Sequence, residues 1–135
     1  MRLLVSILAL AAMLQASVAQ AQDCFQAAKD QRSLDECAGQ QFAAADKQLN
    51  DDFREIQKRL GEGADSRKKF IEAQRAWIAF RDAECAFQTS GVAEGSLYPM
   101  ALAQCKTSLT TDRVKQFKAY LACEEGDLSC PVPGR

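Results

Sequence analysis

The sequence predicts an all-α fold, a small antiparallel helical bundle of three to four helices stapled by disulfides. Two stretches, 33–60 and about 65–88, carry apolar residues at spacings of three and four, which is the period of an amphipathic helix. The chain also holds six cysteines in 135 residues. An even number of cysteines in a short exported chain is most simply a set of three disulfides.

The start of the chain has the features of a secretory signal peptide over residues 1–21. Arg2 supplies a charged start, an apolar run follows, and small residues come next. Cleavage after Ala19 or after Ala21 satisfies the small-x-small rule, and we favour Ala21. The apolar run is too short for a permanent anchor, and nothing later in the chain is apolar enough to replace it. We therefore expect a periplasmic or secreted product with no membrane span.

Removal of this segment leaves 114 residues, enough for one small domain. We expect a helical domain at 22–123 and an irregular tail at 124–135 that Cys130 ties back. The formal charge becomes −2, because one of the 17 basic residues is lost and the 18 acidic residues stay. Nucleic-acid binders normally carry a clustered basic face, so we expect no nucleic-acid partner.

The first predicted helix spans 33–60. Ser33 followed by Glu36 has the pattern of a capping box, and Gly61 supplies a stop after the last apolar position. The apolar stripe consists of Leu34, Ala38, Phe42, Ala45, Leu49, Phe53, Ile56 and Leu60.

The second predicted helix begins at Asp65 or Ser66 and ends at Gln88. Because only a short turn separates it from the first helix, the two should pair antiparallel. Its expected apolar stripe consists of Phe70, Ala73, Trp77, Phe80 and Phe87, with Ile71 and Ile78 at its flanks.

A loop and a broken helix are predicted for the rest of the domain. Residues 89–97 contain two glycines and little apolar periodicity, which is typical of a loop. Pro99 then fits the first turn of a helix. The apolar residues before and after Thr110 are out of phase, which predicts a break and a fresh helix capped by Thr110 or Thr111. That helix should end near Cys123.

The residue types present exclude most catalytic chemistry. The sequence contains no histidine, which removes the commonest general base, the usual zinc ligand and every Ser-His or Cys-His pair. We therefore predict no catalytic residue, no metal site and no cofactor. Four acids of the first helix could act as a glycosidase pair, but acids interleaved with basic residues are more often a solvated face. They are Asp46, Asp51, Asp52 and Glu55.

The cysteines allow several complete pairings. Folding the first two helices back on each other brings Cys37 and Cys85 to the same end, so this pair is a competitor. Local closure instead favours pairs that are close in the sequence. These pairs are Cys24–Cys37, Cys85–Cys105 and Cys123–Cys130.

The second helix carries a distinctive motif of Gln74, Trp77, Arg81 and Asp82. Gln74 and Arg81 lie one turn on either side of Trp77, so the three can share a face. Trp and Arg are typical interface anchors, which makes Arg81 and Asp82 candidates for partner binding. The interpretation we favour for Trp77 places it in the core. Arg81 would then stack on its edge or pair with a carboxylate such as Asp82 or one on a neighbouring helix.

The loop at 89–97 and the start of the next helix form the other candidate for partner binding. Cysteines in both adjoining helices would hold the loop in shape, and Ser and Tyr side chains are common in binding loops. A glycine-rich segment between helices is as often only a connection. The candidate residues are Gly91, Glu94, Gly95, Ser96 and Tyr98.

A wider pattern runs through the chain. It consists of Asp23-Cys24, Glu36-Cys37-Ala38, Ala45-Asp46, Leu49-Asn50, Gln74-x-x-Trp77-x-x-x-Arg81-Asp82-x-x-Cys85, Gly95-Ser96, Cys105, Leu109-Thr110 and Arg113. From Asp23 to about Leu121 this pattern resembles the lysozyme inhibitor LprI N-terminal domain family. The resemblance implies an exported helical domain of the cell envelope, in a family named after a lipoprotein that inhibits lysozyme. This chain departs from that pattern by lacking a lipoprotein cysteine signal and by carrying the additional pair Cys123 and Cys130.

Two functions are compatible with these observations. The resemblance implies a protein that binds lysozyme with a rigid loop or an acidic face and protects the cell wall, without being an enzyme. The alternative is a non-catalytic scaffolding module that binds another envelope protein and has no lysozyme target. A charge near −2 gives little long-range attraction, so specificity would come from the shape of the loop at 91–98 and from the acids of the first helix, Asp46, Asp51, Asp52 and Glu55.

Overall fold

The computed structural model describes residues 24–134, and these residues form helices and loops without strands. The expected signal peptide lies outside the described residues. A single helical turn at 24–27 and a short 3-10 helix, η1 (Ser90–Val92), accompany the long helices. The predicted all-α fold is confirmed. The long helices are α2 (Gln31–Leu60), α3 (Asp65–Gln88) and α4 (Tyr98–Leu121).

The start of α2 differs from the prediction. Asp30 is the N-cap, and its carboxylate accepts a hydrogen bond from the backbone N–H of Ser33 at 2.8 Å. The Ser33 hydroxyl accepts from the backbone N–H of Asp30 at 3.2 Å, which completes a reciprocal capping box. The predicted box of Ser33 with Glu36 is wrong, because a better acceptor stands three residues earlier. Gly61 ends the helix as predicted, with a φ of 80° that favours glycine.

α3 has the predicted bounds but buries a different face. Its buried side chains are Gln74, Arg81 and Cys85. Phe80 and Phe87, which were expected on the buried stripe, are 54% and 74% exposed. The predicted stripe is therefore wrong for Ala73, Phe80 and Phe87, whereas Phe70 and Trp77 pack against the core as expected. A polar face can turn inward where groups on neighbouring helices satisfy its hydrogen bonds.

α4 is one continuous helix, so the predicted break near Thr110 is wrong. Thr110 is fully buried and lies on the same stripe as Val114 and Phe117, the other buried residues of α4. The buried stripe thus passes through a threonine that was expected to be a helix cap, and this polar residue made the apolar residues before and after it look out of phase. Pro99 lies in the first turn, as predicted.

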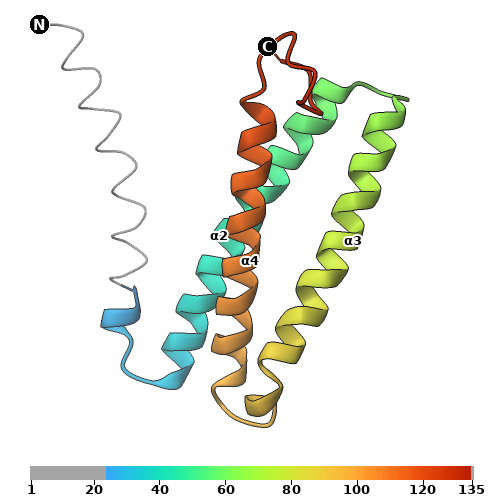
Figure 1. The fold of residues 1–135 in the computed structure, drawn as a ribbon. Helices are drawn as coiled ribbons and strands as arrows, with labels where there is room; N and C mark the ends of the chain where they lie inside the picture. The colour runs from blue at the N-terminus through green and yellow to red at the C-terminus, as the bar shows by residue number, and fades with distance from the viewer. Residues whose placement is uncertain (1–23, 135) are drawn as a thin grey trace, which may run out of the picture.

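The core forms mainly between α2 and α4, which run in the same direction and pack more extensively on each other than on α3 (Figure 1). α3 runs antiparallel to both, which agrees with the predicted hairpin of the first two helices. Leu49 and Ile56 of α2 and Val114 and Phe117 of α4 are buried at the centre. The ring of Phe70 on α3 lies 5.2 Å from that of Phe117 and closes the core from the third side.

All six cysteines are paired, and every pair is the one that local closure favours. The competing pair of Cys37 with Cys85 does not form. The Cα–Cα separations are 5.8, 5.6 and 5.9 Å, which suit disulfides. The pairs are Cys24–Cys37, Cys85–Cys105 and Cys123–Cys130.

The tail after α4 contributes to the core. The Cys123–Cys130 disulfide turns the chain back, and Val132 is 3% exposed in the same cluster as Phe117. The expectation that Cys130 alone ties the tail is wrong, because burial of the Val132 side chain adds a second anchor.

Candidate functional site

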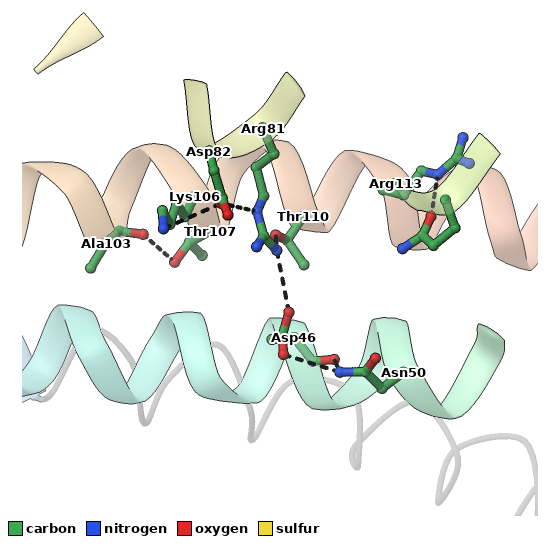
Figure 2. Close-up of polar contacts among 10 residues, drawn as sticks. Asp46, Asn50, Arg81, Asp82, Ala103, Lys106, Thr107, Thr110 and Arg113 are labelled. Atoms are coloured by element: carbon green, nitrogen blue, oxygen red, sulfur yellow. Dashed lines mark hydrogen bonds and ion pairs between the residues drawn. The ribbon is translucent and has the colours of Figure 1, made fainter. Parts of the chain in front are cut away.

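A buried arginine joins the three long helices. Arg81 of α3 is 7% exposed. Its Nη1 donates to Asp46 Oδ1 of α2 and to Thr110 Oγ1 of α4, both at 3.3 Å, and its Nε donates to Asp82 Oδ1 at 3.0 Å (Figure 2). A planar guanidinium holds its donors in fixed directions, which suits a junction of several elements. The expected pairing of Arg81 with carboxylates is confirmed.

Two aromatic rings cover the guanidinium of Arg81. Its Cζ lies 5.2 Å from the ring centre of Phe42 and 5.4 Å from that of Trp77. Both distances are within the range of cation–π attraction. Trp77 is half-buried and packs against the core, so its position agrees with the core interpretation.

Asp82 links α3 to α4 through two cations. Its Oδ1 accepts from Arg81, and Lys106 Nζ of α4 lies 3.2 Å from the same oxygen (Figure 2). Burial alone would raise the pKa of Asp82, but the hydrogen bonds and charges of Arg81 and Lys106 together outweigh burial and hold this pKa below its usual value. Asp82 is therefore ionised at neutral pH.

Gln74 holds a second arginine in place. Gln74 is 5% exposed, and its Oε1 accepts from Arg113 Nε at 3.2 Å. The Cζ of Arg113 lies 4.8 Å from the ring centre of Phe117 and 5.7 Å from that of Trp77. Gln74 and Arg81 of the distinctive motif are therefore buried and Trp77 is half-buried, whereas the Asp82 side chain stays 46% exposed at the edge of the network. Arg81, considered for partner contact, can act on a partner only by holding the helices in position.

The acids of α2 do not form the evenly solvated face that was expected. Asp46 is engaged by the arginine of α3, and Asp51 and Glu55 form ion pairs with basic residues of α2. Asp52 is only 8% exposed, and its Oδ1 accepts from Gln48 Nε2 at 2.9 Å. These contacts leave little free negative charge for a partner on this helix.

The 89–97 loop, which connects α3 to α4, is held at both ends. Thr89 is 7% exposed, and its hydroxyl donates to the carbonyl of Cys85 at 2.7 Å. Cys85 is fully buried and is bonded to Cys105 of α4. Backbone hydrogen bonds of 2.9 to 3.3 Å between residues three apart run through the loop from its first residue to Tyr98. The loop is therefore fixed in shape.

The surface of this loop is open to solvent. Leu97 is 47% exposed, and Glu94 is exposed and takes part in no ion pair with residues of the described chain. An open concavity of about 490 Å³ is lined by residues 90–97. Tyr98 is half-buried, as the first residue of α4. The sequence-predicted candidates that lie at the surface of the loop are Gly91, Glu94, Gly95 and Ser96.

The sequence named Asp46 as an acid of the first helix and Thr110 as a helix cap, but it identified neither as a specific partner of Arg81, and it did not single out Leu97. Leu97 has no periodic signature, because it is the last residue of the loop before α4. Asp46 and Thr110 both stand in the family-like pattern, and a threonine in the middle of a helix stripe is the signal that could have identified Thr110 as a partner of Arg81.

Within residues 24–134, no three or more acidic, cysteine or histidine side chains gather as ligands for a metal ion. Over the same residues, every helix is too short or too polar to span a membrane.

Comparison with known proteins relates both regions to a family. A family model described as "Lysozyme inhibitor LprI" matches residues 13–117, which is more than half of the chain. An uncharacterized protein of Rhizobium meliloti (strain 1021) is 32% identical over 114 residues, covering 76% of this chain and 81% of that protein. No solved structure is detectably similar. The Arg81 network and the 89–97 loop both lie inside the range that the family model matches.

Proposed function

The chain belongs to the LprI lysozyme inhibitor family, and we propose that it binds a lysozyme outside the cytoplasm and keeps the enzyme from the cell wall. It acts without catalysis, by covering the sugar-binding cleft of the enzyme with a fixed surface. The observation that carries this proposal is the 89–97 loop, which is exposed yet held by the Cys85–Cys105 disulfide and by its own backbone hydrogen bonds. A segment that is ordered before binding loses little conformational entropy on association.

The loop offers two kinds of contact. Leu97 presents an apolar side chain that is half exposed, which suits an anchor at the centre of an interface. Glu94 presents an unpaired carboxylate that complements the basic rim of a sugar-binding cleft. The acids of α2 support this less well, because most of their charge is already paired.

An inhibition assay tests the proposal directly. Oxidised protein is mixed with lysozymes of several types, and lysis of a cell-wall substrate is followed over a range of molar ratios. We expect lysis of at least one type to fall as inhibitor is added and to approach zero at molar excess. Undiminished turnover of every type at large excess rejects the proposal and favours a scaffolding module with another envelope partner.

A matched pair of charge reversals locates the contact. Glu94→Lys changes the loop, whereas Glu62→Lys makes the same change in the exposed turn between α2 and α3, at the opposite end of the bundle (Figure 1). We expect E94K to raise the inhibition constant several-fold, mainly through slower association, and E62K to leave it unchanged. Leu97→Ala should raise it roughly tenfold. Equal effects of the two reversals would place the contact elsewhere.

We also infer that residues 1–21 direct export and are removed. The pairing of all six cysteines supports this, because disulfides persist in oxidising compartments and are rare in the cytosol. N-terminal sequencing and intact mass of the protein from the periplasm or medium should give a chain that starts at Gln22 with no free thiol. A full-length cytosolic chain with six free thiols would contradict export.

A further inference from the structure

We propose that the protein forms a weak two-fold symmetric dimer through an exposed stripe of α3. The stripe consists of Ala76, Phe80, Ala83 and Phe87, at spacings of four, three and four residues. This spacing puts all four side chains on one side of the helix. None of them belongs to the Arg81 network or to the 89–97 loop, so the proposal is independent of lysozyme binding.

The stripe is apolar surface that the bundle leaves uncovered. Phe80 is 54% and Phe87 is 74% exposed, and both alanines between and before them are exposed as well. α3 is the outer helix of the three and packs least on its neighbours (Figure 1). The two rings leave on the order of 250 Å² of apolar surface in water per copy, and a dimer would cover roughly twice that area from the rings alone.

In one orientation, the large side chains of the stripe on one copy lie opposite the small side chains of the stripe on a second copy. If two copies of α3 run antiparallel about an axis between residues 81 and 82, Phe80 faces Ala83 of the second copy. In the same register Phe87 faces Ala76 of the second copy. The two layers lie about 2 and 8 Å from the axis along the helix, given a rise of 1.5 Å per residue. Every large side chain thus meets a small one, which is the arrangement that fills an interface without voids or clashes.

A parallel pair of the same helices lacks this complementarity, because each phenylalanine would face its own counterpart and each alanine would face an alanine. The antiparallel pair also satisfies closed two-fold symmetry, in which one patch contacts itself and no surface is left to add further copies. A second copy of the chain is therefore the occupant that this stripe fits.

Charge and side-chain size around the stripe permit this approach. Ala79 and Ala86 flank one side of it and allow the helix backbones to come close. The nearest acid on the other side, Glu84, already accepts a hydrogen bond from Gln88 of its own helix at 2.8 Å. None of the four residues of the stripe is charged.

The area predicts a dimer of modest affinity. Stable specific interfaces bury about 1,200 to 2,000 Å² in total, and weak ones lie below this range. Rings that supply roughly 500 Å², with alanines around them, place this interface below that range, among weak associations. We therefore expect weak association, so that the protein is mostly monomeric at micromolar concentrations and dimerises only towards a millimolar.

Sedimentation equilibrium of the oxidised protein over a range of concentrations from micromolar to about a millimolar tests the association. The wild-type protein should change from monomer to dimer and should show no larger species. A protein that stays monomeric over the whole concentration range overturns the proposal. A monomeric protein that binds lysozyme through this face of α3 overturns it as well.

An exchange of side chains tests the register. Phe80→Ala opens a void opposite Ala83, and Ala83→Phe places two rings against each other, so each change should weaken the dimer at least tenfold. The double variant F80A/A83F again puts a ring opposite an alanine and should restore the wild-type association. Leu128→Ala serves as the control, because Leu128 is a fully exposed apolar side chain on the tail.

Both exchanged positions are on the exposed side of α3, so the helical content measured by circular dichroism should stay the same in all variants. A dimer that is unaffected by F80A shows that another surface associates. Failure of the double variant to recover shows that the antiparallel register is wrong. Weakening by L128A equal to that by F80A shows non-specific association, and each of these results overturns the proposal.

Discussion

Replacing Arg81 with methionine tests whether the buried arginine network holds α3 against the other helices. Methionine keeps an unbranched apolar stem beside Phe42 and Trp77, so the change removes the guanidinium with little loss of packing. The interactions lost are hydrogen bonds to two carboxylates and to one buried hydroxyl, together with the attraction to two rings.

The magnitude follows from how well the former partners of Arg81 can be solvated. The side chains of Asp46 and Asp82 are 39% and 46% exposed, so each regains water and contributes little. Thr110 is fully buried and loses its donor, which costs about 1–3 kcal/mol. Loss of the cation–π contacts adds roughly 1 kcal/mol. We expect the free energy of unfolding to fall by about 3 kcal/mol and the thermal midpoint by roughly 10 °C.

Urea unfolding followed by circular dichroism, under oxidising conditions, measures this change. Arg75→Met is the matched control, because Arg75 is an exposed arginine of the same helix with no ion pair in the described chain. Its effect should stay within about 0.5 kcal/mol. A loss below about 1 kcal/mol for R81M, or equal losses for the two variants, would refute the role assigned to the network.

Three further outcomes are expected. Because the pKa of Asp82 is lowered in the folded state, its ionised form stabilises the fold above pH 4, and this stability is lost as the pH falls through the folded-state pKa. In a urea-unfolding series between pH 6 and 2, Asp82→Asn should reduce the dependence of the free energy of unfolding on pH. An unchanged pH dependence would contradict this prediction. Changing Cys123 and Cys130 together to serine should lower the free energy of unfolding by about 2 kcal/mol, measured by urea unfolding. The change should also release Val132 from the core, which faster proteolysis of the tail would show, whereas a tail that stays protected would show that the disulfide is not its main anchor. Asp30→Ala should fray the first turn of α2 and speed hydrogen exchange there, and unchanged exchange would show that the cap contributes nothing.

Helix bounds could be predicted wherever local chemistry sets them. Gly61 stops α2 because the chain there needs a positive φ, and Gln88 ends α3 where the glycine-containing loop begins. The start of α2 was missed by two residues because two side chains nearby could each act as the cap. The disulfides were predictable for the same reason, since each pair closes a segment of at most 20 residues.

The interior face of α3 could not be predicted from periodicity. A count of apolar residues favours the side that carries Phe80 and Phe87, yet that side is exposed. The partners that make Arg81 stable inside, Asp46 and Thr110, are 35 and 29 residues away along the chain. The candidate site also contains one part that the sequence could predict and one part that it could not. The loop could be recognised from its own composition, whereas the placement of the motif residues required the neighbouring helices.

The sequence by itself determined the first two long helices and the family and favoured the local disulfide pairs, because each depends on residues that are close in the chain or on a pattern that can be read directly. Only the tertiary structure decided which side of α3 is buried, that α4 runs unbroken past Thr110, and that Val132 joins the core. The physical reason is that a buried polar side chain is stable only where hydrogen-bond partners surround it, and those partners come from segments far apart in the sequence.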